Sequence, residues 1–179
     1  EPTNKCVIEC SACARTIFKK RFPKKKQVDE IDIDQLCNFL GDKTECVDIE
    51  GVYGDAIYHS KILELLGRLK QKNIRIRLTT NASGKSKIFW TKLESILSDD
   101  DEVMFSIDGL EDTNHIYRKN SKWHTIVPAL EIFGKSKLKT TWKFIVFKHN
   151  QNQIEEAREF SKKIGIDNFV LIKNTRHYD

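Results

Sequence analysis

Residues 47–80 read VDIEGVYGDAIYHSKILELLGRLKQKNIRIRLTT, and this stretch decides the fold class. Val47 to Gly51 is typical of a short buried strand, and Ile74 to Thr80 alternates apolar and polar residues as a strand does. Between them, Ser60 is a candidate cap for a helix whose apolar residues recur at helical spacing: Ile62, Leu65, Leu66 and Leu69. Two strands joined through a helix predict a βαβ unit with parallel strands.

The same alternation continues to the end of the chain. Further strands are predicted at Glu102–Asp108, Thr140–Phe147 and Asn168–Lys173, and helices at Ile88–Leu97, Thr125–Phe133 and Gln153–Ile164. This order indicates an α/β protein with a parallel sheet and right-handed crossovers. Both a flat doubly wound sheet and a sheet curved into a barrel are consistent with it.

Composition and length favour one ordinary globular domain. The chain has 179 residues, of which 39% are hydrophobic and 32% charged. It contains neither an apolar run long enough to cross a bilayer nor a signal peptide at its first residues, so no membrane partner is expected. Five cysteines are an odd number, which suits a reducing compartment better than a disulfide scaffold. A cytoplasmic location is therefore expected.

Three of the cysteines form a CxxxCxxC motif: Cys6, Cys10 and Cys13. Iron–sulfur clusters and closed structural zinc sites take four ligands, so three thiolates would leave one iron of a cluster open for chemistry. A disulfide pair, or a zinc site completed by a distant His or Cys, remains an alternative.

The other two cysteines are interpreted as core thiols. Cys37 lies on an apolar helix face with Leu36, Phe39 and Leu40, and Cys46 opens a strand expected to be buried. No cysteine follows Cys46, so these residues would hold a single cluster.

The run from Arg15 to Lys26, RTIFKKRFPKKK, carries much of the net charge of +5. It is interpreted as a solvated face, or as a surface for a polyanion or an acidic electron donor such as a flavodoxin. The aromatic residues Phe18, Phe22 and Phe39 are too few for base stacking, which argues against a nucleic-acid partner without excluding it.

Polar residues follow the predicted strands, where parallel βα folds place their active sites. They are Tyr53, Asp55, Asn81, Ser106, Asp108, Lys148, His149, Asn150 and Asn174. The cysteine loop is expected at the same edge of the sheet. Any one of these residues can also serve simply as a turn former.

The first fifteen residues, EPTNKCVIECSACAR, resemble the start of a radical S-adenosylmethionine (radical SAM) enzyme. The resemblance implies that Cys6, Cys10 and Cys13 bind a 4Fe–4S cluster. Ala12 stands where relatives usually have an aromatic residue that packs near the adenine of the cofactor. The family fold is a partial (β/α)6 TIM-like barrel. Residues 1–5 are too few for its first strand, so residues 1–179 are expected to be a single radical SAM core domain, a fragment without that strand or a C-terminal extension.

Two further segments carry the resemblance. Gly51-Val52-Tyr53-Gly54-Asp55 resembles the GGE motif, which implies that Tyr53, Gly54 and Asp55 bind the methionine ammonium of SAM. Residues 106–123, SIDGLEDTNHIYRKNSKW, are similar to the fourth-strand segment of the SPASM and twitch-domain groups. That similarity implies contacts to SAM from Ser106, Asp108 and Arg118. Asn120 stands where relatives commonly have Gly and can still adopt a left-handed turn, and Trp123 is interpreted as a core residue that packs the next helix.

Asn81, in TTNAS, matches the TNG segment of the family and adds another cofactor contact. The implied function is reductive cleavage of SAM to a 5′-deoxyadenosyl radical, which abstracts hydrogen from a substrate. A peptide is the first expectation for that substrate, with Lys148 and His149 on the substrate side and flavodoxin or ferredoxin as the electron donor. The alternatives are a catalytically inert iron–sulfur module, for electron transfer or regulation, and a structural zinc domain.

Overall fold

The computed structural model describes residues 1–25, 30–41 and 43–175. Its sheet has five parallel strands in sequence order: β1 (Cys46–Ile49), β2 (Arg75–Thr80), β3 (Glu102–Ser106), β4 (Lys139–Val146) and β5 (Asn168–Lys173). A doubly wound sheet needs a point where the strand order reverses, and these strands have none. The flat doubly wound alternative is therefore wrong, and the strand order is that of a barrel wall.

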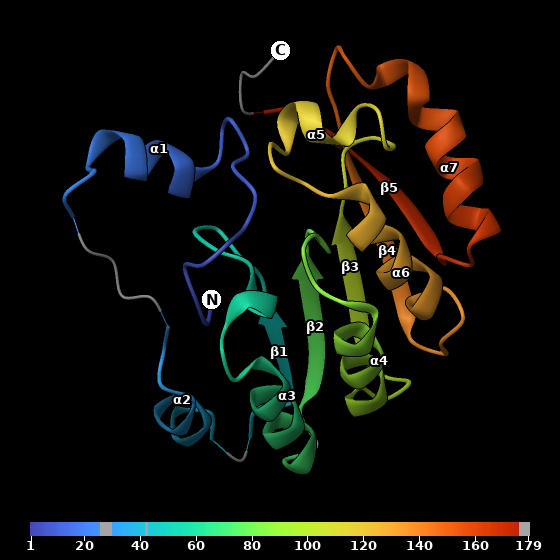
Figure 1. The fold of residues 1–179 in the computed structure, drawn as a ribbon. Helices are drawn as coiled ribbons and strands as arrows, with labels where there is room; N and C mark the ends of the chain where they lie inside the picture. Colours follow the sequence, from blue (N-terminus) through green and yellow to red (C-terminus); the bar gives the residue numbers. More distant parts are fainter. Residues whose placement is uncertain (26–29, 42, 176–179) are drawn as a thin grey trace.

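Four helices connect successive strands and cover one face of the sheet (Figure 1). They are α3 (Ile62–Gln71), α4 (Lys87–Ile96), α6 (Trp123–Phe133) and α7 (Ile154–Lys163). Neighbouring helices pack against each other, α3 against α4 and α4 against α6. Helices on one side leave the other face of the sheet open toward the inside of the partial barrel.

Shorter elements complete the described chain. Helices α1 (Ala14–Arg21) and α2 (Ile33–Phe39) precede the sheet, and α5 (Asn114–Tyr117) follows β3. Two 3₁₀ turns, η1 (Ala56–Tyr58) and η2 (Gln151–Gln153), follow β1 and β4. The predicted strands and helices are thus confirmed, with boundaries that differ by at most two residues at either end.

The main core lies between the sheet and the helices. The predicted apolar face of α3 is buried there, and aromatic side chains fill the space beneath the later helices: Trp90, Phe105, Phe133 and Trp142. The indole of Trp142 donates a hydrogen bond to the carbonyl of Ile107 over 2.8 Å, so its only polar atom has a partner. A second cluster of buried side chains, Ile8, Cys10, Tyr117 and Phe147, supports the cysteine loop.

Several predictions about single side chains are wrong. Phe39 is 84% exposed, because it lies on the side of α2 that faces away from the core. Cys37 is buried as predicted, whereas Cys46 is only half-buried because β1 forms an edge of the described sheet. Ser60 does not cap α3. Its hydroxyl donates to Glu30, and Lys61 is the residue that precedes the helix.

Two smaller predictions are confirmed. Asn120 adopts a left-handed conformation with φ of 68°, and Trp123 packs against the core at the start of α6. Before the cysteine loop, the described residues contain no strand of the sheet, and Thr3 forms only an isolated antiparallel bridge with Glu30. Within the described ranges, none of the helices combines the length and the apolar character that a bilayer span requires.

Candidate functional site

A pocket of about 600 Å³ lies where the cysteine loop meets the carboxyl ends of the strands. Eight of the ten sequence-predicted site residues line it: Cys6, Cys10, Cys13, Gly54, Asp55, Asn81, Ser106 and Arg118. Tyr53 and Asp108 do not. These residues come from the first loop, from the ends of β1 to β3 and from the segment after α5. Sequence positions more than a hundred residues apart thus share one cavity.

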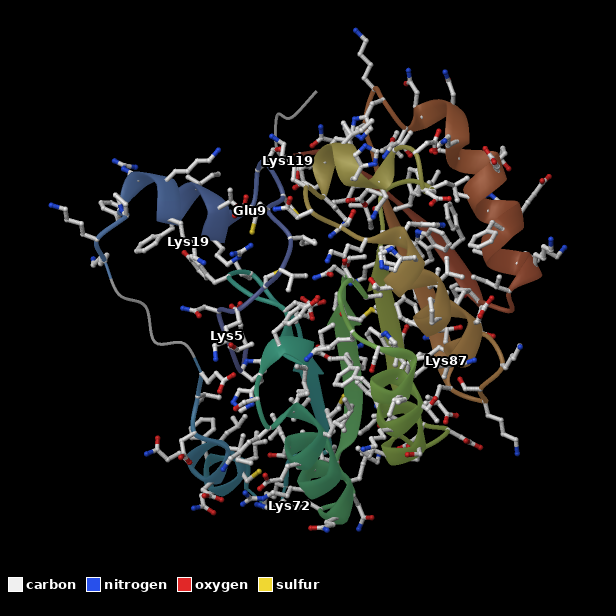
Figure 2. All side chains as sticks on the ribbon, in the orientation of Figure 1. Lys5, Glu9, Lys19, Lys72, Lys87 and Lys119 are labelled. Atoms are coloured by element: carbon white, nitrogen blue, oxygen red, sulfur yellow. The ribbon has the colours of Figure 1, made fainter. Side chains whose placement is uncertain are left out.

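The cysteine loop is fixed to the body of the protein by backbone hydrogen bonds. The N–H of Glu9 donates to the carbonyl of Lys119 over 2.8 Å (Figure 2), and the N–H of Asp55 donates to the carbonyl of Lys5 over 2.9 Å. Within the loop, the N–H of Cys13 donates to the carbonyl of Cys10 over 3.1 Å. Ile8 and Cys10 are buried against Tyr117 and Phe147. Helix α1 begins directly after Cys13, so the loop is held at both of its ends.

The thiols of the loop lie in an environment that opposes their ionisation in the absence of metal. Burial, and then the carboxylate of Asp55, raise the pKa of Cys6 to about 11. Burial also raises the pKa of Cys10, against the opposing effect of the Arg118 guanidinium. Metal ligation requires thiolates, so loading of this site is expected to release protons.

The residues present fit an anionic cluster. Arg15 is buried and lines the pocket, and its Nη2 donates to the carbonyl of Ile8, but its Nε has no hydrogen-bond partner among the described residues. A buried cation with an unused donor favours a negatively charged occupant. Across the described chain, no three His, Cys, Asp or Glu side chains converge on one metal ion. A cluster does not need this convergence, because each thiolate binds a different iron.

Asp55 is held on the pocket wall by residues at the carboxyl end of β2. Its Oδ2 accepts hydrogen bonds from the hydroxyl of Thr80 over 3.0 Å, from the N–H of Asn81 over 2.7 Å and from the Asn81 side-chain amide. Burial raises the pKa of Asp55 to about 6, although these hydrogen bonds favour the carboxylate. The Asn81 amide also lies 3.5 Å from the sulfur of Cys6, so Asn81 connects the acidic group to the cysteine loop.

The turn before Asp55 has a structural role as well. A Cβ atom at Gly54 would clash with the backbone of Thr3 and Asn4, so the glycine is required for the close approach of the N-terminal segment. Tyr53 points away from the pocket. Its ring makes an edge contact with Phe18 at 6.4 Å between centroids and lines a neighbouring cavity.

Asp108 is 0% exposed and lies behind the pocket wall. Its Oδ1 accepts the N–H of Ile145 over 2.8 Å, and its Oδ2 lies 2.7 Å from Nε of Arg118. Burial would lower the pKa of Arg118, but the Asp108 carboxylate and the Cys10 thiol raise it above its ordinary value. Asp108 therefore orients the guanidinium that lines the pocket.

The pocket contains further residues that the sequence reasoning missed. Lys143 of β4 is the register partner of Ser106, and its Nζ lies 3.4 Å from the carboxylate of Glu50. Both Lys143 and Glu50 sit on the open face of the sheet, and strand alternation was the signal that could have placed them there. Arg15 was missed because it begins a run of lysines that are exposed. The predicted substrate-side residues Lys148 and His149 do not line this pocket.

Comparisons with known proteins agree with this geometry. The model of the Radical SAM superfamily matches residues 1–164. The structure is similar to that of Streptococcus suis SuiB bound to S-adenosylmethionine, with 19% identity and a TM-score of 0.75 over 96% of this chain and 39% of SuiB. It is also similar to TYW1 with a lysine–pyruvate adduct bound, with 12% identity and a TM-score of 0.68 over 97% of this chain and 63% of TYW1. Comparison with curated protein sequences gives no match.

The fold is thus the partial barrel of radical SAM proteins, and the chain spans about two fifths of the length of SuiB. The chain belongs to the radical SAM superfamily. The cofactors of this superfamily are a 4Fe–4S cluster and S-adenosylmethionine, as predicted from the sequence.

Proposed function

We propose that this chain is the catalytic core of a radical SAM enzyme, with Cys6, Cys10 and Cys13 as cluster ligands. The observation that carries the proposal is the shared pocket, in which the three cysteines face Asp55, Asn81, Ser106 and Arg118. Electron transfer alone requires no such polar wall. When bound, the cluster and SAM supply reductive cleavage of the cofactor to a 5′-deoxyadenosyl radical, which abstracts hydrogen from a substrate.

The residues of this chain position the cofactor and limit access of water. Asp55 presents a carboxylate for the methionine ammonium, and Arg118 presents a guanidinium suited to the methionine carboxylate. Asp108 acts on SAM through Arg118 rather than by direct contact. Gly54 and Tyr53 shape the turn that carries Asp55, and Ser106 offers a hydroxyl at the end of β3.

A peptide is the substrate class that we favour. Residues 106–123 resemble the fourth-strand segment of SPASM and twitch-domain enzymes, and we assign this chain to that group. SuiB, which has the same fold, has a crystal structure bound to its precursor peptide SuiA. The open face of the sheet, where Lys143 and Glu50 lie, offers charged groups that a peptide can pair with.

A one-electron donor such as flavodoxin or ferredoxin would supply the reducing equivalent, in a reducing compartment such as the cytoplasm. All five cysteines are free thiols in this structure, which suits that setting.

Asp55→Asn is expected to weaken SAM binding about 10- to 150-fold, because a hydrogen bond to a charged group contributes about 1.5–3 kcal/mol. The measurement is titration of SAM into the reconstituted protein. Asp48→Asn removes an exposed carboxylate from β1 outside the pocket, so it serves as the matched control and should leave the affinity unchanged. Equal affinities for the Asp55 and Asp48 variants would remove Asp55 from the cofactor site.

The catalytic proposal is tested by release of 5′-deoxyadenosine from SAM with a strong chemical reductant and no substrate. The wild-type protein is expected to release it slowly, and Cys13→Ala is expected to release none. Ser106→Ala should reduce release about 2- to 10-fold through the loss of a neutral hydrogen bond. Lys148→Ala and His149→Ala change residues outside the pocket and should leave this uncoupled release intact.

A protein that carries a full cluster and binds SAM, yet yields no 5′-deoxyadenosine, would contradict the enzyme and support the inert cluster module. A protein that holds zinc and takes up no iron would support the structural zinc domain instead.

A further inference from the structure

A second cavity of about 430 Å³ lies beside the cysteine loop, between the N-terminal segment and the end of α1. Its lining residues are Asn4, Lys5, Cys6, Lys19, Phe22, Pro23 and Lys25. Among the residues that the structure describes, Cys6 alone lines both cavities. A molecule seated in the second cavity would therefore approach the predicted cluster ligand without entering the SAM pocket.

The surface around this cavity is strongly basic. Between residues 10 and 28 the sequence has no acidic residue, and five cations of its described part are exposed: Lys19, Lys20, Arg21, Lys24 and Lys25. Figure 2 shows Lys5 and Lys19 on the same side of the molecule, whereas Lys87 lies at the opposite side. Lys5 is paired with the carboxylate of Glu30 over 3.1 Å, so the positive charge at the entrance that leads to Cys6 comes mainly from the cations of residues 19–25. Such a patch attracts negatively charged partners and accelerates their encounter.

Apolar groups lie within the basic patch. Phe22 is 43% exposed and Ile17 is 52% exposed. The side chains of Arg21 and Lys25 lie over the Phe22 ring, at 5.5 and 5.7 Å from its centroid, so the ring is not presented for stacking with a base. An apolar centre surrounded by charge is typical of a surface that binds a protein. These features favour an acidic protein over a nucleic acid.

We propose that this basic surface is the docking site for an acidic flavodoxin, which delivers one electron to the cluster on the Cys6 side. The proposal rests on the proposed function. In the transfer, the anionic flavin hydroquinone loses one electron, no proton is exchanged, and the cluster gains that electron. Separate cavities allow the donor and SAM to be bound at the same time, since within the described ranges the two cavities share Cys6 and no other lining residue.

The test is a calorimetric titration that measures the affinity of oxidised flavodoxin for the reconstituted protein at low ionic strength. Lys19→Glu/Lys25→Glu is expected to weaken binding at least about tenfold and to reduce its dependence on salt. Lys87→Glu/Lys92→Glu makes the same change in net charge on the exposed side of α4, so it is the matched control and should bind flavodoxin nearly as the wild type does.

A second measurement follows reduction of the cluster by reduced flavodoxin in a stopped-flow instrument. The Lys19/Lys25 variant should be reduced at least about tenfold more slowly than the wild type, while dithionite reduces both at the same rate. The proposed docking site would be overturned if the wild type and the Lys19/Lys25 variant bound flavodoxin equally well. It would also be overturned if the Lys87/Lys92 control lost as much affinity, or if the wild type bound no flavodoxin. Failure of the proposed function is recognised separately, because 5′-deoxyadenosine would then be absent with dithionite as well.

Discussion

Replacement of Cys10 by alanine is expected to abolish cluster binding altogether. Cys10 lines the pocket between Cys6 and Cys13, and a three-cysteine site has no spare ligand with which to compensate for its loss. Alanine retains an apolar group against Tyr117 and Phe147, so the loop is expected to remain packed. The measurements are iron content and visible absorption after anaerobic reconstitution, and Cys6→Ala and Cys13→Ala should give the same result.

Cys37→Ala is the matched control for this experiment, because Cys37 is a free and buried thiol in the main core, outside the pocket. Its replacement, like that of Cys46, should leave the iron content unchanged. Full iron loading of the Cys10 variant would show that the three cysteines are not the ligand set. Loss of iron from the Cys37 variant would show that the iron content falls whenever the fold is destabilised, whether or not a cluster ligand is removed.

The sheet could be predicted from the sequence because its evidence is local. Apolar spacing within ten residues distinguishes α3 from β2, and a parallel order follows from their alternation. The common edge of the sheet then follows from the direction of the strands. For this reason the sequence placed Asp55, Asn81 and Ser106 together correctly, although they are separated by long stretches of chain.

The direction of individual side chains could not be predicted in the same way. Ser106 and Asp108 are two apart, so strand alternation places them on one face, but β3 ends at Ser106 and Gly109 turns the chain with φ of 148°. Asp108 consequently lies behind the pocket wall. Whether a helix face is covered depends equally on elements distant in sequence, which is why Phe39 was wrongly expected on a buried apolar face.

Asp108→Ala is expected to destabilise the protein by about 3–5 kcal/mol, because it leaves a buried guanidinium without its carboxylate. The Arg118 side chain is 10% exposed, and the N–H of Ile145 would lose its acceptor as well. Urea unfolding of the apoprotein measures the change. Asp48→Ala breaks the exposed pair with Arg77 and should cost less than about 1 kcal/mol, which makes it the matched control.

The double variant Asp108→Ala/Arg118→Met separates the two roles of this ion pair. It leaves no unpaired charge in the core, so much of the stability lost in Asp108→Ala is expected to return. Affinity for SAM is expected to remain low, because the guanidinium that lines the pocket is gone. A double variant that binds SAM as the wild type does would show that Arg118 and Asp108 serve the fold alone, and the carboxylate of SAM would then need another partner among the pocket residues.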